Sequence, residues 1–166
     1  MEQTLHSVAG YELMSFLDGF SGYSQILVHL DDKLKTTFRT KWGTYAYQKM
    51  PFRLINVGAT FQRAMDIAFK GLINKLVAVY LDDITIFSKK ISSHLHVLKL
   101  IFQCCKRYGI SLNPKKSYFS LDQGKLLGFV VSKDGIYIDP DRIKEISDIH
   151  FPHNKKTMQT FLGQII

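Results

Sequence analysis

Short apolar runs, often alternating with polar residues and separated by turn residues, predict several β-strands along the chain. The expected strands span 13–18, 36–40, 44–50, 76–80 and 84–87, and a further hairpin spans 124–140. Turns are predicted at 41–43 (KWG) and 133–135 (KDG), where glycine follows charged or aromatic residues. Neighbouring runs joined by such short turns predict a sheet with largely antiparallel strands.

Two segments, 59–74 and 92–108, show apolar residues at helical spacing. Ser92 or Ser93 can cap the start of the second helix, and Gly109 lies where helices commonly end. The apolar faces are expected to contain Phe61, Met65, Phe69 and Leu72 in the first helix and Leu95, Leu98, Phe102 and Cys105 in the second.

The C-terminal part predicts two more helices. Asp139 is placed to cap a helix that starts at Pro140 and continues through Ile143 and Ile146, and 157–166 begins a further helical pattern. Strand runs with helices between and after them predict an α+β domain in which an antiparallel sheet carries helices on one side.

Length and charge narrow the class of protein. The 166 residues, 46% of them hydrophobic, suffice for one domain with a substantial core, and the net charge of +8 favours a polyanionic partner such as nucleic acid. The two cysteines, Cys104 and Cys105, are adjacent and suit a reduced, intracellular protein. No apolar run approaches the length of a membrane span, so no membrane partner is expected.

Two adjacent acids, Asp82 and Asp83, lie between the apolar runs of one predicted hairpin. Their simplest interpretation is a polar turn, because Asp favours turns. A second interpretation is half of a metal site, since hard divalent cations prefer carboxylate oxygens that converge from separate elements. Asp18 is the best partner for such a site, because it ends an apolar strand and precedes Gly19.

Six blocks of sequence together resemble the reverse transcriptases of gypsy-type long-terminal-repeat retrotransposons (Metaviridae), in order and approximate spacing. The blocks are SFLDGFSGYSQI, YQKMPFRLINVGATFQRAMD, VYLDDITIFSK, HLHVLKLIFQCCKRYGISLNPKKSYF, GKLLGFVVSKDGIYIDPDRIKEI and FLG. The resemblance covers nearly the whole chain. It implies an RNA-directed DNA polymerase with a right-hand fold, expressed as a fragment of a Pol polyprotein.

The resemblance also implies how the chain divides. Residues 1–25 and 57–137 correspond to the palm and 26–56 to part of the fingers, so that 1–137 forms one unit. Residues 138–166 correspond to the beginning of a truncated thumb.

The catalytic and metal-binding residues implied by the resemblance are Asp18, Asp82 and Asp83. They would hold two Mg²⁺ ions, with Mn²⁺ as a substitute, for the transfer of deoxynucleotides to a primer 3′-hydroxyl. Asp83 is expected to be the more peripheral ligand.

Three further positions correspond to the nucleotide and template side. Tyr23 would exclude a ribose 2′-hydroxyl, while Phe52 and Gln62 would line the substrate. From the residues alone, the interpretation of Tyr23 and Phe52 as core aromatics is favoured.

The primer grip corresponds to Leu127, Gly128 and Phe129, although a strand bend is the favoured interpretation of Gly128 without the resemblance. The implied partners are an RNA or DNA template with a DNA primer, dNTPs, and the ribonuclease H, integrase and protease domains of the polyprotein. The implied location is a cytoplasmic virus-like particle.

One residue departs from the family pattern, in which a glycine stands where this chain has Arg53. Because this change adds a long cationic side chain, and because further fingers and thumb segments of the family lie outside the chain, we expect the isolated chain to be weakly active or inactive. Two other hypotheses stay open: a non-catalytic nucleic-acid-binding remnant of a decayed element, and a fragment that does not fold.

Overall fold

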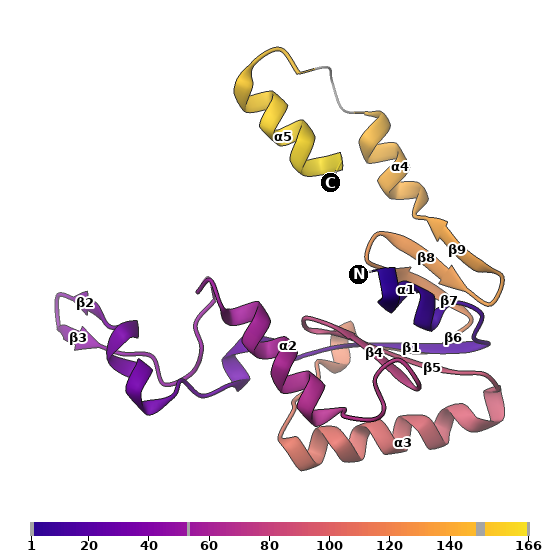
Figure 1. Ribbon diagram of the computed structural model, residues 1–166, viewed down its shortest axis with the longest axis horizontal. Helices are drawn as coiled ribbons and strands as arrows, with labels where there is room; N and C mark the ends of the chain where they lie inside the picture. Colours follow the sequence, from indigo (N-terminus) through magenta and orange to yellow (C-terminus); the bar gives the residue numbers. More distant parts are fainter. Residues whose placement is uncertain (1, 53, 149–151, 166) are drawn as a thin grey trace.

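A four-stranded antiparallel sheet forms the centre of the protein (Figure 1). The computed structural model describes residues 2–52, 54–148 and 152–165. The strands lie in the order β4-β5-β1-β6, and every neighbouring pair is antiparallel. Their bounds are Leu13–Asp18 for β1, Val77–Tyr80 for β4, Asp83–Ser88 for β5 and Tyr118–Leu121 for β6. This order places the β4–β5 hairpin directly beside the end of β1.

Both faces of the central sheet are covered, which explains the unbroken burial of β5. The buried residues of this strand are Ile84, Thr85, Ile86, Phe87 and Ser88. Because side chains alternate between the two faces of a strand, such a run requires packing on both sides.

Helices α2 (Val57–Ala68) and α3 (Ile91–Tyr108) cover one face of the sheet. The cluster between them and the sheet includes Leu17, Phe61, Met65, Phe69, Val79, Ile86, Val97 and Ile101. These are the predicted helices on one side of the sheet, and Phe61, Met65 and Phe69 are buried as expected.

A short helix and a second sheet cover the opposite face. Helix α1 spans Glu2–Val8, and the second sheet is an antiparallel meander of β7 (Gln123–Leu126), β8 (Phe129–Ser132) and β9 (Gly135–Ile138). The cluster on this side contains Leu5, Val8, Met14, Ala78, Phe87, Leu126 and Val131. Residues 124–140 therefore form three strands rather than the single predicted hairpin, because a second tight turn falls between β7 and β8.

Residues 26–52 extend away from the central sheet (Figure 1). They contain the 3₁₀ helix η2 (Leu30–Thr36) and the hairpin of β2 (Phe38–Thr40) and β3 (Gly43–Tyr45). A small separate core holds this part, formed by Val28, Met50 and Val57. The predicted strand pair 36–40 and 44–50 is thus present but shorter, since Thr36 ends η2 and regular pairing stops at Tyr45.

The C-terminal helices are present where the sequence predicts them. Helix α4 (Pro140–Ser147) starts at its proline, and the Asp139 side chain accepts a hydrogen bond from the Asp141 N–H at 3.1 Å. Helix α5 spans Lys155–Ile165. None of the helices within the described ranges combines the length and apolar character needed to cross a bilayer.

Helix α3 is rotated relative to the face predicted from sequence. Leu98 and Cys105 are buried, but Leu95 and Phe102 are 69% and 39% exposed. The buried face instead includes His94, Val97 and Ile101. The predicted residues and the buried residues both recur at helical spacing. Because His94 is polar, the sequence did not indicate that it belongs to the buried face of the helix. In α2 the helix ends at Ala68, so the predicted position Leu72 lies beyond it.

Candidate active site

The two adjacent acids lie at the tight turn between β4 and β5. Tyr80 pairs with Asp83 across the hairpin, so the loop consists of Leu81 and Asp82 alone. Leu81 has φ of 54°, a conformation that non-glycine residues seldom adopt. The Oε1 atom of Gln62, on α2, accepts a hydrogen bond from the Leu81 N–H at 3.2 Å. Helix α2 thereby holds the strained turn in place.

Asp18 meets this turn through the register of the central sheet. It is the last residue of β1 and pairs directly with Asp83, the first residue of β5. Its carboxylate accepts a hydrogen bond from Asn113 Nδ2 at 3.2 Å and lies 4.0 Å from Lys116 Nζ. Lys116 lies in the 3₁₀ helix η3 (Pro114–Lys116), just before β6.

Close backbone packing brings Asp82 against the segment that follows β1. The Gly19 N–H donates to the Asp82 carbonyl at 2.9 Å. Gly22 is buried, and a Cβ at that position would lie 3.3 Å from Asp82 Cβ. A side chain there would be unusually crowded, so glycine permits the approach of the turn to the segment carrying Tyr23.

The electrostatics of the turn favour a bound cation. Desolvation raises the pKa of the Asp83 carboxyl, and the charges of Asp82 and Asp18 raise it further, while Lys116 opposes them. A divalent cation would reverse this balance, because it favours the ionised carboxylates that repel one another without it.

The carboxylates do not form a closed metal cage. Within residues 2–52, 54–148 and 152–165, no three His, Cys, Asp or Glu side chains converge as a metal-binding group. The donor set nevertheless fits a hard cation, since it consists of carboxylate oxygens whose mutual repulsion a cation relieves. Reverse transcriptases as a family use divalent metal ions.

A cavity of about 400 Å³ lies on one side of these carboxylates. Its lining includes Asp18, Asp82, Tyr23, Phe52 and Lys116. The Tyr23 ring packs edge-on against Phe61, with centroids 5.3 Å apart, and lies 6.0 Å from the ring of Phe52. Burial, followed by the charge of Asp82, raises the pKa of the Tyr23 hydroxyl. The Tyr23 ring therefore lines the cavity beside Asp82 in a position held by Phe61, whereas the Phe52 ring lines the cavity and is exposed to solvent.

A larger cavity of about 570 Å³ lies beside the first. Asp18 and Lys116 line both, and Asp83, Lys125 and Leu127 belong to the second alone. The two cavities thus meet at Asp18, the residue that pairs with the hairpin acids.

The predicted grip residues form the tight turn between β7 and β8. Leu127 and Gly128 both have positive φ, 54° and 78°, and Phe129 begins β8. Leu127 lines the larger cavity, whereas Gly128 lies under the side chain of Arg142. A Cβ at Gly128 would meet only the flexible side chain of Arg142, so it is the positive φ that favours glycine at this position.

The structure brings most of the predicted site residues together but not all. The three aspartates, Tyr23, Phe52 and Leu127 line the two adjoining cavities, while Gln62, Gly128 and Phe129 line neither. Gln62 instead bonds to Leu81, Asp66 and the Val79 carbonyl. Arg53 lies outside the described residues.

Sequence reasoning missed Asn113 and Lys116 as neighbours of Asp18. The only local signal was the NPKKS segment, where a short polar residue and a proline precede two lysines. Nothing in that segment shows that it lies against a strand end far earlier in the chain.

The fold is that of a polymerase palm with part of the fingers. It matches the foamy viral protease-reverse transcriptase in complex with an RNA/DNA hybrid with a TM-score of 0.84, at 23% identity over 98% of this chain and 22% of that one. The structure of the foamy viral protease-reverse transcriptase in complex with double-stranded DNA matches with a TM-score of 0.84 at 22% identity. This match covers 99% of this chain and 34% of the foamy viral chain.

Sequence comparison identifies the family. Residues 1–131 match the family "Reverse transcriptase (RNA-dependent DNA polymerase)", and the chain belongs to this family. It is 36% identical over 160 residues to the Pol polyprotein from transposon opus of Drosophila melanogaster and 35% identical over 147 residues to that from transposon gypsy of the same organism. These matches cover 96% and 89% of this chain but only 16% and 14% of the relatives. The chain therefore corresponds to part of the reverse transcriptase domain of a retrotransposon Pol polyprotein.

Proposed function

We propose that this chain carries the polymerisation site of its polyprotein, in which Asp18, Asp82 and Asp83 hold two Mg²⁺ ions or, in their place, Mn²⁺. The observation that carries the proposal is the pairing of Asp18 with Asp83 at the point where two cavities meet. Bound divalent cations would supply the positive charge that activates a primer 3′-hydroxyl and stabilises the departing pyrophosphate.

The residues of the smaller cavity bind and orient the incoming dNTP. The Tyr23 ring, fixed by Phe61, occupies the floor beside Asp82, where a ribose 2′-hydroxyl would collide with it. Lys116, which is 70% exposed and near Asp18, supplies a positive charge facing the triphosphate. Gln62 contributes by holding the turn that positions Asp82 rather than by touching the substrate.

The residues of the larger cavity receive the primer end. Leu127, which shares its tight turn with Gly128, lines this cavity together with Asp83, which suits a grip on the primer backbone. The template, the flanking fingers and thumb, and the ribonuclease H, integrase and protease domains complete the proposed assembly. Residues 1–25 and 57–137 act as palm, 26–56 as fingers and 138–166 as the start of the thumb.

Primer extension tests this proposal when the chain replaces the matching segment of the opus Pol polyprotein. With Mg²⁺, an RNA template and a DNA primer, we expect the chimaera to incorporate dNTPs and the Asp82→Asn chimaera to lose at least about 100-fold in rate. Asp122→Asn, an exposed acid outside both cavities, is the matched control. Equal rates for Asp82→Asn and the unsubstituted chimaera would refute the metal-site assignment.

A further inference from the structure

Helix α3 carries a second apolar face that the protein leaves uncovered. Ile91, Leu95, Leu98, Phe102 and Cys105 follow one another at alternating steps of four and three residues, the spacing of a helix–helix seam. Leu98 and Cys105 pack into the core, whereas Ile91 and Leu95 are 67% and 69% exposed and Phe102 is 39% exposed. The core therefore covers only one side of this seam.

A ring from the central sheet extends the uncovered side. Phe119, on the edge strand β6, is exposed, and its ring centroid lies 6.3 Å from that of Phe102, with the planes inclined by 67°. We call the surface formed by Ile91, Leu95, Phe102 and Phe119 the α3 surface. Helix α3 lies along one margin of the molecule (Figure 1), and none of these four residues lines the two cavities of the candidate active site.

The charge around the α3 surface is positive and unbalanced. Residues 84–121 contain seven Lys and Arg and no Asp or Glu, so they account for all but one unit of the net charge of +8. Lys99 follows Leu95 by four residues and Lys106 follows Phe102 by four, so both lysines flank the α3 surface on the same side. Among the residues that the structure describes, neither lysine has an acidic side chain as an ion-pair partner.

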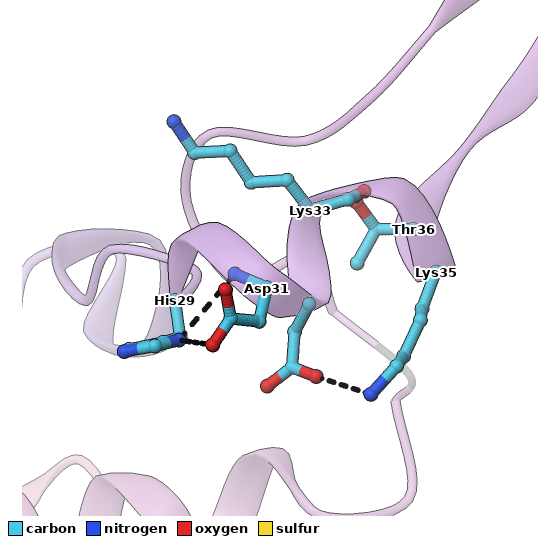
Figure 2. Close-up of polar contacts among 6 residues, drawn as sticks. His29, Asp31, Lys33, Lys35 and Thr36 are labelled. Carbon is cyan, nitrogen blue, oxygen red and sulfur yellow. Dashed lines mark hydrogen bonds and ion pairs between the residues drawn. The ribbon is translucent and has the colours of Figure 1, made fainter.

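Another exposed leucine lies in a balanced setting. Leu34 is 78% exposed on η2, a helix that contains two Asp and two Lys. Figure 2 shows this segment, in which Lys35 Nζ lies 2.6 Å from Asp32 Oδ1. Unpaired cations thus distinguish the α3 surface from this second apolar position.

The edge of β6 is poorly shaped for an added strand. Its pairing with β1 shifts register between Met14 and Phe16, and Ser120 has φ of 56°. The Ser120 N–H donates to Ser15 Oγ at 3.0 Å. Irregular edges of this kind discourage strand addition, so a helix packed along α3 is the favoured occupant.

We propose that the α3 surface binds an acidic amphipathic helix of a partner protein, whose apolar side chains cover the surface and whose Glu or Asp side chains face Lys99 and Lys106. Exposed apolar patches with a polar rim are typical of protein interaction sites, and charges that flank a helix seam select the partner helix. The unbalanced positive charge beside the seam therefore calls for an acidic partner.

Two other occupants fit less well. A second copy of the chain presents the same positive charge at the same surface and would be repelled. Nucleic acid would find no ring at Ile91 or Leu95 on which a base could stack. In addition, α3 covers the face of the central sheet opposite the second sheet, whose strand β7 lines the larger cavity.

Two synthetic peptides test the proposal on the 166-residue chain. Both are about three heptads long with Leu at the two seam positions, and the flanking positions are Glu in the acidic peptide and Lys in the basic one. Repulsion between like charges keeps each peptide from pairing with itself. We expect the acidic peptide to bind at least about 10-fold more tightly than the basic one in fluorescence anisotropy, and to shift the NMR amide signals of residues 91–107 and 119.

Charge reversal gives the sharpest variant. Lys99→Glu combined with Lys106→Glu should invert the preference, so that the basic peptide binds about 10-fold more tightly than the acidic one. The matched control combines Lys155→Glu with Lys156→Glu, at two exposed lysines of α5. This control changes the net charge equally and should keep the preference for the acidic peptide.

An apolar substitution tests the contact itself. Leu95→Ala should weaken binding of the acidic peptide about 10-fold, because it removes apolar area that the peptide buries. Leu34→Ala removes an equally exposed leucine and should leave binding unchanged. Circular dichroism confirms that each variant is folded.

Three results would overturn the proposal: equal binding of the two peptides, an inverted preference in the α5 control as well, or amide shifts that lie away from the α3 surface. Dimerisation of the chain that Leu95→Ala abolishes would assign the surface to a second copy instead. Single-stranded RNA that shifts residues 91–107 where the acidic peptide does not would assign it to nucleic acid. Peptide binding requires neither metal nor dNTP, so its outcome is independent of the primer-extension test.

Discussion

Asp18 and Asp83 are direct partners in the antiparallel register of β1 and β5. With Asp82 preceding Asp83 in the tight turn, three negative charges gather at one end of the central sheet. Repulsion among these charges lowers the stability of the cation-free protein and increases its affinity for cations. A loss of stability at functional groups is expected where a site serves metal-dependent chemistry.

Replacing Asp83 by Asn should therefore stabilise the cation-free chain. The pKa of Asp83 is raised above its ordinary value of 3.8, so its unfavourable contribution is absent at low pH and grows as pH rises through the folded pKa. Because Asp83 is only partly desolvated and its surface stays accessible to solvent, which screens its charge, we expect a gain of no more than about 1 kcal/mol at pH 7. Thermal denaturation at pH 3.5 and pH 7, without divalent cations, measures it. A gain of the same size in Asp122→Asn would show that the effect is unspecific.

His94 occupies the centre of a buried hydrogen-bond network. Its Nε2 lies 2.8 Å from Ser15 Oγ and its Nδ1 lies 2.9 Å from Ser88 Oγ. The Ser88 hydroxyl donates to the Lys90 carbonyl, so it accepts from Nδ1–H. Ser15 Oγ accepts from the Ser120 N–H and donates its own proton to Nε2. The network therefore satisfies a neutral ring protonated on Nδ1, with the Ser15 hydroxyl as the donor to Nε2.

The stability of the protein should consequently fall in mild acid. Burial lowers the pKa of His94 below its ordinary value of 6.5, so the unfolded chain takes up this proton first. The stability contributed by the neutral His94 ring is fully present above about pH 6.5 and is lost as pH falls through the pKa of His94 in the folded protein. His94→Ala should cost about 2–3 kcal/mol at pH 7, because it removes one hydrogen-bond partner from each of Ser15 and Ser88 and leaves a cavity where the buried ring was. The difference between the two proteins should shrink by pH 5 in chemical denaturation.

The exposed His96 provides the matched control for this pH dependence, and His96→Ala should change stability by less than about 0.5 kcal/mol. A difference between wild type and His94→Ala that is constant from pH 7 to pH 5 would contradict the neutral-ring network.

Gly124 should be among the least replaceable glycines of the structure. A Cβ at this position would lie 2.1 Å from the ring of Phe16, so alanine forces Phe16 out of its place against the second sheet. We expect Gly124→Ala to cost about 2 kcal/mol or more in the free energy of unfolding. Gly163 lies in α5 with nothing within 4 Å, so Gly163→Ala should be neutral or stabilising by up to about 1 kcal/mol. Denaturation of the two variants in parallel tests the packing of β7 on β1.

Much of this arrangement follows from local sequence. The apolar run ending in Asp18, the turn chemistry around Lys133-Asp134-Gly135 and the Asp139-Pro140 helix start are local signals, and the structure confirms the elements that they predict. Two other features could not be predicted from local sequence. The burial of His94 depends on serines from two strands, and the contact of Asn113 and Lys116 with Asp18 depends on the sheet order β5-β1-β6.

The conformation of the turn at Leu81 also could not be predicted from local sequence. Its positive φ is supported by Gln62 from a different element, a contact that no periodicity predicts. Gln62→Leu should therefore accelerate hydrogen exchange at the Leu81 amide about 5- to 10-fold, by removing the acceptor of its hydrogen bond. Asp66→Ala removes one of the two partners of the Gln62 amide nitrogen, leaves the Gln62 acceptor of the Leu81 N–H in place, and should leave exchange at Leu81 unchanged. Equal acceleration in both variants would show that the hydrogen bond from Leu81 to Gln62 does not hold the turn.

The most direct test of the proposed metal site is a Mn²⁺ titration of the 166-residue chain followed by NMR. If Asp18, Asp82 and Asp83 bind the cation, amide signals of residues 17–19 and 81–84 broaden first, and Asp82→Asn abolishes this selectivity while Asp122→Asn preserves it. Broadening that starts elsewhere, or that Asp82→Asn leaves unchanged, would contradict the assignment of these three carboxylates as the metal site of a polymerase.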